Sequence, residues 1–474
     1  MPKESVHLMK STFFLTAVFS FSAFAMENDK LSQFTNLNLN NSVNNELAEF
    51  KQRRTTLLSL VEKQHKKTGP ILLVAGFDQE LLEFEQEKSF YYYTGIVHPG
   101  LTLMLEQNKS SIYAPKYLRD PLLWTDYSVV SQETVQAAGI DEFLFIGKAI
   151  EPGCTSALCD SPEHYANLIS NLKKRIQEKQ TIYSLNSTSE GLYNQHITFL
   201  RNLMKHVPGL ESSLKDISPL VAHMRRTKSA LEIQKMEASI ALSIKGFNKI
   251  APKIRDGLSQ TQIRTKIESV FTACGAQPAY YSIVGSGDTI HYLHPKPSHL
   301  VKVKNGDLVL IDAGARKEYY CADLTRTFPV SGKFTERQKE IYNLVLATQQ
   351  HLANTVKPGF YISNRKEADK SLNCIAKTFL KEHGGFDHCL PHGVSHHLGL
   401  DVHDPVTDWE MALKEGDVIT IEPGIYIKDE QIGIRIEDNY LITENGAQCL
   451  SAALPKTVEE IEALMQSGKK NMIR

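Results

Sequence analysis

The sequence has no excess of charge of either sign: 53 lysines and arginines stand against 54 aspartates and glutamates, for a formal charge of -1 at pH 7. This balance gives no general attraction to nucleic acid or to an anionic membrane. The apolar run from Phe13 to Phe24 is shorter than the roughly 20 residues that a membrane-spanning helix needs. We therefore expect no nucleic-acid partner and no stable membrane insertion.

Cysteine is also scarce, and the seven cysteines form no paired C-x-x-C motif. This argues against a disulfide scaffold and against a cysteine-based structural zinc site. Cys154 and Cys159 lie in the loop-like segment EPGCTSALCDSPE. If the protein is exported, a short disulfide between these two is favoured over two free thiols.

The first 25 residues differ from the rest. Lys3 and Lys10 precede the apolar run, and Ala23-Phe24-Ala25 supplies small residues at a cleavage point. This pattern is typical of a signal peptide over residues 1–25 and predicts an exported protein, either periplasmic or secreted. An uncleaved N-terminal arm on a cytoplasmic protein is the alternative.

At 474 residues the chain is longer than one hydrophobic core usually serves, so two domains are expected. Residues 26–45 are rich in asparagine, which predicts a polar linker. Over residues 46–215, helical stretches alternate with short apolar runs such as ILLVAG and LTLML, as in an α/β domain. Residues 216–474 mix strand-like runs with helices, which indicates an α+β domain; the helices are expected near 229–250, 260–273, 335–354 and 364–383.

Four acids of the second domain stand where a strand is normally apolar. Asp312 follows the apolar run 308–311, and Asp323 lies on what is expected to be the return strand of a hairpin. Glu422 and Glu437 are each preceded by alternating apolar residues and separated by a turn-bearing stretch. The members of each pair are expected to face each other.

Buried carboxylates need compensating cations, because an unpaired ionised carboxylate in a low-dielectric interior is strongly disfavoured. Arg326 and Arg435 are the obvious cations nearby, and they are too few for four acids. Bound metal is the economical explanation, and the segment HGVSHHLGLDVHD (392–404) offers the nitrogen donor. An oxygen-dominated site with one imidazole suits two divalent ions of Mn²⁺, Co²⁺ or Zn²⁺.

The five candidate ligands resemble, in order and context, those of the M24 metallopeptidases: Asp312 in IDAGA, Asp323 in ADLTRTFP, His396 in HGVSHHLGLDVHD, Glu422 in TIEPGIY and Glu437 in IRIEDN. Within that family the sequence is most similar to the Xaa-Pro aminopeptidases, with Xaa-Pro dipeptidase next. EFKQRRTTLLSL, SFYYYTGIVHPG and RRTKSALEIQKM resemble the family's first domain and interdomain helix. The resemblance implies a creatinase-like (ribonuclease-H-like) α/β N-terminal domain and a pita-bread α+β C-terminal domain.

The resemblance also implies the chemistry. Asp312 would chelate one ion, Asp323 and Glu437 would bridge both, and His396 and Glu422 would complete the second. A hydroxide between the ions, most suitably Mn²⁺, would attack the bond between an N-terminal residue and a following proline. Glu422 would take the proton of the nucleophile and pass it to the leaving nitrogen.

Further residues receive roles from the same resemblance. His403 and His291 would contact the substrate and stabilise the tetrahedral intermediate, with His294 as the alternative to His291. Arg435 would hold site carboxylates. His392 and Tyr426 would line the substrate pocket, and His397 would lie in the pocket wall or face solvent.

The resemblance implies peptide substrates with proline at the second position, and a homodimer or homotetramer. Xaa-Pro dipeptidase (prolidase) is the alternative activity. A metal-free pita-bread binding module is less favoured, because such proteins lose ligands and all five are present here.

Overall fold

The computed structural model describes residues 29–66, 69–78, 83–120, 130–151, 161–187, 194–408 and 410–467, with side chains from residue 45 onward. The predicted signal peptide and the Cys154–Cys159 pair lie outside the described residues. The chain divides into two compact units, Met1–Val221 and Ala222–Arg474. Among the helices described, none is long and apolar enough to cross a membrane.

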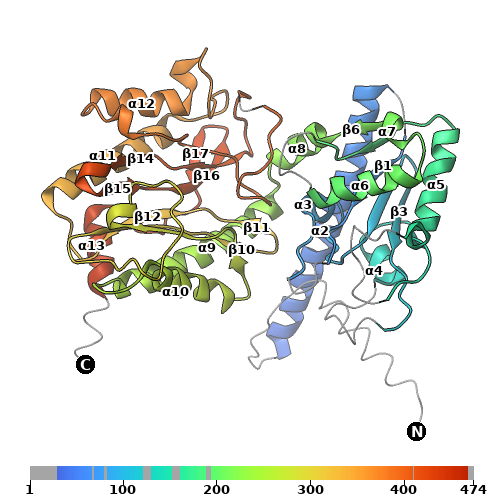
Figure 1. Ribbon diagram of the computed structural model, residues 1–474, viewed down its shortest axis with the longest axis horizontal. Coiled ribbons are helices and arrows are strands. Elements are labelled where there is room, and N and C mark those ends of the chain that lie inside the picture. The colour runs from blue at the N-terminus through green and yellow to red at the C-terminus, as the bar shows by residue number, and fades with distance from the viewer. Residues whose placement is uncertain are drawn as a thin grey trace, which may run out of the picture. The chain divides into compact units, whose positions relative to one another are not determined.

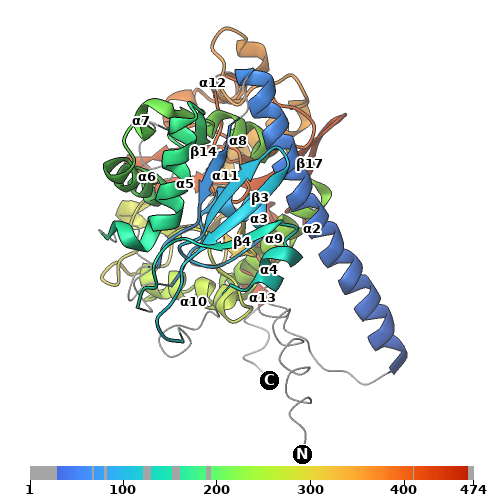
Figure 2. The same cartoon turned by 90° about the vertical axis from the view of Figure 1, so that its right-hand side faces the viewer.

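The first described element, α2 (Asp29–His65), differs from the predicted polar linker over residues 26–45, because the helix already begins at Asp29. Its C-terminal part buries Phe50, Leu57 and Val61 and packs against α3 and β2. Once a helix is nucleated, each further residue is added at little cost. Packing around Phe50 therefore allows the helix to extend through the asparagine-rich stretch, where it is drawn as one long helix in Figure 2.

The first unit contains a mixed six-stranded sheet in the order β4-β3-β2-β1-β5-β6, in which β1 runs antiparallel to β2 and parallel to β5. Buried leucines of α5 and α6, such as Leu172 and Leu200, share one core with Leu72 and Val74 of β1. The strands are β1 (Ile71–Val74), β2 (Thr102–Glu106), β3 (Lys109–Ala114), β4 (Glu142–Phe145), β5 (Ile182–Ser184) and β6 (Leu214–Asp216). The helices after α2 are α3 (Lys88–Thr94), α4 (Gln132–Ala137), α5 (Ala166–Gln177), α6 (Asn194–His206) and α7 (Leu210–Ser213).

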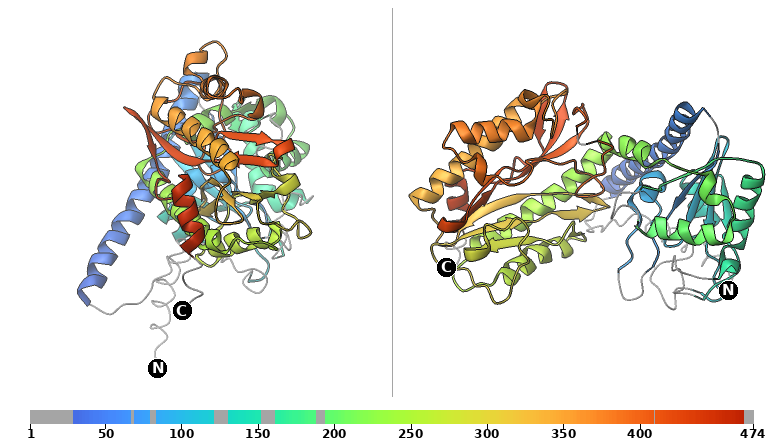
Figure 3. Two further views of the ribbon diagram at one scale, coloured as in Figure 1. Left: turned by 90° about the vertical axis from the view of Figure 1, so that its left-hand side faces the viewer. Right: turned by 45° about the horizontal axis from the view of Figure 1, so that its top comes forward.

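The second unit places its strands between two layers of helices. Helices α9 and α10 lie on one side and α11 and α12 on the other, as Figure 1 and the right-hand view of Figure 3 show. This is the predicted pita-bread arrangement. The helices are α8 (Ser218–Arg226), which spans the division between the units, α9 (Ala230–Ile250), α10 (Gln260–Thr272), α11 (Glu336–Thr355), α12 (Leu372–Glu382) and α13 (Val458–Ser467).

The strands of the second unit form short sheets in the orders β11-β10-β7, β12-β9-β8, β13-β16-β17 and β14-β15. They are β7 (Gln277–Pro278), β8 (Ile283–Ser286), β9 (Leu308–Asp312), β10 (Ala315–Lys317), β11 (Tyr320–Cys321), β12 (Thr325–Pro329), β13 (Val418–Ile421), β14 (Gly424–Ile427), β15 (Ile432–Arg435), β16 (Asp438–Thr443) and β17 (Gly446–Cys449). Single turns of 3-10 helix complete the description: η2 (Pro162–Tyr165), η3 (Ala251–Lys253), η4 (Gly287–Thr289), η5 (Ala368–Lys370), η6 (Asp387–Cys389) and η7 (Lys428–Glu430).

One helix begins later than predicted. The sequence predicts a helix over residues 364–383, but α12 begins at Leu372. The side chain of Asn364 accepts hydrogen bonds from the backbone N–H groups of Lys366 and Glu367. Because this local bonding competes with helix formation, the segment before Leu372 folds as turns.

Candidate metal centre

The strand registers bring the acids of three hairpin segments to one place. Asp312 ends β9 opposite Thr325 of β12, and a bridge between Thr325 and Glu437 joins β12 to the segment that links β15 to β16. Glu422 lies between β13 and β14, where the pairs Ile421–Asp438 and Gly424–Arg435 continue one antiparallel register. That register sets Glu422 opposite Glu437, so Asp312, Glu422 and Glu437 converge at the ends of separate strands.

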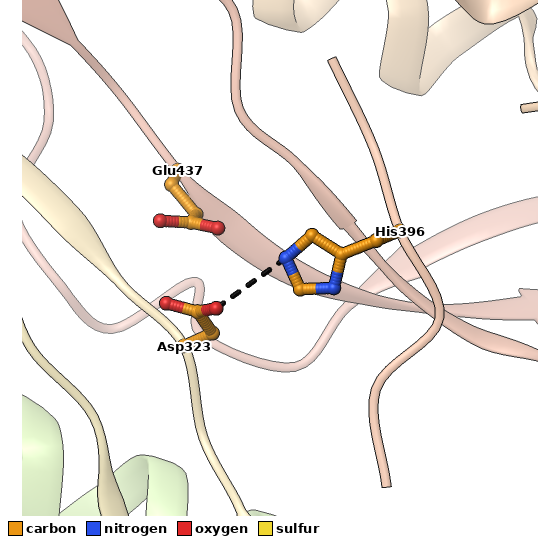
Figure 4. A group of neighbouring side chains, drawn as sticks. All are labelled: Asp323, His396 and Glu437. Carbon is orange, nitrogen blue, oxygen red and sulfur yellow. Dashed lines mark ion pairs between the residues drawn. The ribbon is translucent and has the colours of Figure 1, made fainter. Parts of the chain in front are cut away.

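Asp323, His396 and Glu437 form the centre of this site, and all three are buried. Each offers a ligand atom within 4.8 Å of the others, and Nε2 of His396 lies 3.4 Å from Oδ2 of Asp323 (Figure 4). The Nδ1 atom of His396 lies 3.1 Å from the carbonyl oxygen of His397, to which it donates when protonated. This leaves Nε2 directed at the carboxylates.

Glu422 approaches the same ring nitrogen of His396 as Asp323 does. Its Oε1 lies 3.4 Å from Nε2 of His396 and accepts a hydrogen bond of 3.4 Å from the Thr420 hydroxyl. The same hydroxyl accepts the backbone N–H of His396 at 3.1 Å, so one threonine orients both residues. Burial raises the pKa of Glu422 to about 7, although the positive charges of His396 and Arg435 oppose the rise.

Asp312 is held by two partners. Nη2 of Arg435 donates to its Oδ2 at 2.5 Å, and the Tyr280 hydroxyl lies 2.5 Å from its Oδ1. The Tyr280 hydroxyl also lies 2.5 Å from Oδ1 of Asp323 and so connects the two aspartates. The sequence analysis missed Tyr280, because the irregular stretch PAYYSI has no period that distinguishes it from Tyr281.

Thr325 is a second residue that the sequence analysis missed. Its hydroxyl donates to Oε2 of Glu437 at 2.7 Å and accepts from Nε of Arg435 at 3.2 Å. A signal was present, since Thr325 follows Asp323 by two residues and strand side chains alternate between faces.

The predicted pocket residues His392 and Tyr426 contact each other. Nε2 of His392 lies 3.0 Å from the Tyr426 hydroxyl, which accepts a hydrogen bond of 2.8 Å from Nη1 of Arg435. Burial and, to a smaller extent, the positive charge of Arg435 lower the pKa of His392 to about 4. The imidazole of His392 is therefore neutral, with Nδ1 at 2.8 Å from the Gly393 carbonyl oxygen and Nε2 at the Tyr426 hydroxyl.

Three histidines are expected to contact the substrate or are alternatives for that role: His403, His291 and His294. The ring of His403 lies 4.2 Å from that of His396, which places it at the centre. Among the described contacts, it is His294 whose charge acts on both His392 and His403, whereas the ring of His291 contacts Tyr292.

His397 differs from the expectation that it lines the pocket wall or faces solvent. Its side chain is buried at 4% exposure, and the nearest charges are those of Lys228, Arg226 and Asp404. Side chains alternate along the extended segment that pairs with β13, so His397 points away from the face on which His396 lies.

The pKa values of two further acids and of one histidine of this centre are raised. Burial raises the pKa of Asp312, with Arg435 opposing and Asp323 adding to the rise. Burial and then the charges of Asp323 and Glu422 raise the pKa of Glu437 well above its usual value. Burial lowers the pKa of His396, but the hydrogen bond with Asp323 and the charge of Glu422 overcome it and raise that pKa to about 9.

This donor set fits divalent cations. Among the described residues, Arg435 is the only lysine or arginine that forms an ion pair with any of the four acids. Arg326, the other expected cation, donates instead to Asp438 at 2.8 Å. Carboxylate oxygens with one imidazole suit transition-metal and similar divalent ions, whose charge would balance acids that otherwise retain protons.

Comparison with known proteins agrees with this geometry. The profile of metallopeptidase family M24 matches residues 234–444, and that of the aminopeptidase P N-terminal domain matches residues 50–152. The chain is 30% identical to an Xaa-Pro aminopeptidase of Haemophilus influenzae over 448 residues, which cover 88% of this chain and 97% of that protein. The chain belongs to the M24 metallopeptidases.

Solved structures support the assignment along both units. This M24 metallopeptidase matches aminopeptidase P from Escherichia coli, solved with the inhibitor Pro-Leu, with a TM-score of 0.72 and 26% identity over 90% of this chain and 99% of that one. An Xaa-Pro dipeptidase of Pyrococcus furiosus is 36% identical over 241 residues, which cover 50% of this chain. Membership of this family implies divalent metal ions, and Asp323, His396 and Glu437 form the buried group able to hold one.

Proposed function

We propose that this M24 metallopeptidase is an Xaa-Pro aminopeptidase, which hydrolyses the bond between an N-terminal residue and a following proline. The observation that carries the proposal is the match along 97% of the Haemophilus influenzae Xaa-Pro aminopeptidase, with both units included. The buried acids and histidine of the second unit supply groups suited to peptide hydrolysis.

We infer that Asp312, Asp323, His396, Glu422 and Glu437 hold two divalent ions, with Mn²⁺ the best suited to a carboxylate-rich set. By the family resemblance, Asp323 and Glu437 would be shared by the two ions, and both offer a ligand atom within 4.8 Å of His396. Bound divalent ions supply Lewis acidity, which lowers the pKa of water and polarises a peptide carbonyl.

The protein's own groups would move protons and hold the substrate. Glu422 would accept a proton from the attacking water and return it to the leaving nitrogen. His403 and a histidine of the 291–294 segment would donate hydrogen bonds to the carbonyl under attack. His294 acts electrostatically on His392 and His403, so it is a stronger candidate for this role than the sequence alone suggests, beside His291.

Xaa-Pro dipeptidase is the second candidate, favoured by the 36% identity of the catalytic unit to the Pyrococcus furiosus enzyme. A dipeptidase must bind the substrate's carboxylate next to the proline, which calls for a free cation. In the described part of the centre, the guanidinium of Arg435 already donates to Asp312, Tyr426 and Thr325. This engagement favours the aminopeptidase.

One assay tests both activities. An Xaa-Pro dipeptide and an Xaa-Pro-Yaa tripeptide are incubated with the purified protein, with and without Mn²⁺. We expect Mn²⁺-dependent release of the N-terminal residue from the tripeptide. If only the dipeptide is cleaved, the proposed activity is wrong and the protein is a dipeptidase. A protein that carries no stoichiometric metal and cleaves neither peptide would be a binding module.

We also propose export and self-assembly into a homodimer or homotetramer. Export rests on the signal pattern of residues 1–25, and assembly rests on the family resemblance alone. Cell fractionation of the full chain and sedimentation of the purified protein test the two proposals separately.

A further inference from the structure

The segment RRTK (225–228), which ends α8 and leads toward α9, buries three cations. Arg225, Arg226 and Lys228 are 1%, 3% and 5% exposed. Buried cations require partners, since an isolated charge in the interior is strongly disfavoured. The partners lie far along the chain, in two loops of the same unit.

The main partner is Asp404, which is itself only 3% exposed. Nη2 of Arg225 donates to its Oδ1 at 2.6 Å, and Nζ of Lys228 donates to its Oδ2 at 3.0 Å. The backbone N–H of Asp401 adds a third hydrogen bond to Oδ1 at 3.2 Å. Gly399 is required beside this carboxylate, because a Cβ there would lie 2.7 Å from Oδ2 of Asp404.

Asp404 is connected to His396 through one carbonyl group. The backbone N–H of Asp404 donates to the His397 oxygen at 3.0 Å. The same oxygen lies 3.1 Å from Nδ1 of His396. A hydrogen bond at Nδ1 sets the tautomer of a ligand histidine and the direction of its Nε2.

Asp404 is also the next residue after His403, whose ring lies 4.2 Å from that of His396. A shift of the Asp404 backbone would therefore move both histidines. Burial opposes ionisation of Asp404, but the charges of Lys228 and Arg225 overcome it and lower the pKa of this carboxyl to about 2. The group is an anion at any working pH.

We propose that Asp404, held by Arg225 and Lys228, is a positioning residue that fixes the tautomer and aim of His396 and the placement of His403. This inference rests on the proposed function, in which both histidines belong to the centre. Among the described hydrogen bonds and ion pairs, none joins the Asp404 carboxylate to a predicted metal ligand; its partners are Arg225, Lys228 and the Asp401 N–H. Asp404 acts on His396 through the His397 carbonyl and on His403 through the peptide bond that joins the two residues.

The chain offers a matched control. Asp417 is fully buried and accepts hydrogen bonds from Nε and Nη2 of Arg226, the cation between Arg225 and Lys228. Its carboxylate also accepts the backbone N–H of Lys414 at 2.9 Å, and no described hydrogen bond connects that carboxylate to His396, His397 or His403. Val418, the next residue, accepts the backbone N–H of Leu398 at 3.0 Å, and this backbone hydrogen bond does not involve the Asp417 carboxylate. Asp417→Asn therefore breaks a similar buried pair without removing a described hydrogen bond of the histidine segment.

The test compares Asp404→Asn with Asp417→Asn in the full chain. The apo proteins are titrated with Mn²⁺ alone by calorimetry, and kcat and KM are measured on an Xaa-Pro-Yaa tripeptide. For Asp404→Asn we expect Mn²⁺ affinity and kcat to fall about 10- to 100-fold with little change in KM, as for removal of a group that orients a metal ligand. For Asp417→Asn we expect a lower melting temperature with unchanged Mn²⁺ affinity and kcat.

Wild-type Mn²⁺ affinity in Asp404→Asn would overturn the proposal, as would an equal loss in Asp417→Asn. If Asp404→Asn does not fold, Lys228→Met and Lys228→Arg decide instead: weaker Mn²⁺ binding in the first, restored in the second, supports the proposal, and equal binding in both overturns it. If the wild-type protein cleaves no Xaa-Pro peptide, the proposed function fails while the Mn²⁺ titrations still decide the role of Asp404.

Discussion

Arg435 and Asp312 form a buried ion pair in which Nη2 of the arginine lies 2.5 Å from Oδ2 of the aspartate. The same guanidinium donates from Nη1 to the Tyr426 hydroxyl at 2.8 Å and from Nε to the Thr325 hydroxyl at 3.2 Å. One side chain therefore fixes an acid of β9, a tyrosine of β14 and a threonine of β12. A planar fork with separate donors is needed for this arrangement.

Arg435→Lys should keep the charge and lose the geometry. A single ammonium group cannot reach all three acceptors, so Asp312 and Tyr426 should lose their fixed positions. We expect kcat on an Xaa-Pro-Yaa tripeptide to fall about 10- to 100-fold. Arg337→Lys is the control, because Arg337 is 40% exposed and pairs with Glu430 on the surface. Equal activity in the two variants would contradict the role of Arg435.

Glu422→Gln should abolish turnover and leave the fold intact. Glutamine keeps the shape of the side chain and cannot accept a proton, so general acid–base catalysis is lost. We expect kcat to fall at least about 100-fold, with an unchanged circular dichroism spectrum. Glu444→Gln, at an exposed position, serves as the control. Near-normal turnover in Glu422→Gln would assign the proton transfer to another group.

The convergence of the acids could be predicted because their strands carry a clear period. Apolar residues alternate before Glu422 and before Glu437, and a two-residue period determines the face to which each side chain points. The structure shows the two glutamates opposite each other in one continuous register. Asp323 lies two residues before β12, so the expected return strand was placed slightly too early.

Other parts of the site depend on contacts that no local pattern encodes. Tyr280 reaches Asp312 and Asp323 from an irregular segment. His397 is directed inward by the pairing of its segment with β13, although its sequence context is polar. The start of α2 at Asp29 was missed because asparagine has a weak helix propensity, so the local composition of this stretch does not indicate a helix.

His196 should make stability depend on pH in mildly acidic solution. It is fully buried, with Nδ1 accepting the Val74 N–H at 3.4 Å and Nε2 lying 2.8 Å from the Ser184 hydroxyl, which itself donates to the Leu72 carbonyl. The neutral ring satisfies both contacts, whereas a proton on Nδ1 would face another N–H. Burial lowers the pKa of His196 from 6.5 to about 3.

Because the folded pKa lies below the unfolded value, the unfolded chain binds more protons between these two values. The stabilisation is complete above pH 6.5 and is lost as the pH falls toward 3. Denaturant unfolding should show about 1.4 kcal/mol lost per pH unit between about pH 6 and 4 from this group. His196→Gln should have a smaller slope over that range, and an identical slope would contradict the assignment.

Lys179→Gly should stabilise the first unit. Lys179 follows α5 with a φ of 57°, a left-handed conformation that favours glycine, and its side chain is exposed. Its N–H donates to the Ile176 carbonyl at 2.9 Å, and the next N–H donates to the Arg175 carbonyl. We expect a gain of about 1 kcal/mol in denaturant unfolding. Lys173→Gly, inside the same helix, should instead cost about 1 kcal/mol.

Arg54 belongs to the motif EFKQRRTTLLSL, which resembles the family's first domain, and its contacts give this residue a structural role. The side chain is 4% exposed, and carbonyl groups accept all its described hydrogen bonds: Tyr93 from Nη1 at 2.7 Å, and Ala138 and Gly139 from Nη2 at 2.9 and 2.7 Å. Tyr93 lies in the last turn of α3, and Ala138 follows the last residue of α4. A cation suits the negative ends of two helices.

Arg54→Met should therefore destabilise the first unit without touching the metal centre. The substitution leaves the buried carbonyl groups of Tyr93 and Ala138 without this donor, and the Gly139 carbonyl, which is partly buried, also loses it. Each buried unsatisfied group costs about 1 kcal/mol or more, so we expect a loss of about 2 kcal/mol or more in denaturant unfolding. Arg201→Met, at an exposed position of α6, should change stability by less than about 0.5 kcal/mol. Mn²⁺ affinity should be unchanged in both variants. A loss of affinity confined to Arg54→Met would contradict this assignment and would connect the arginine with the metal centre.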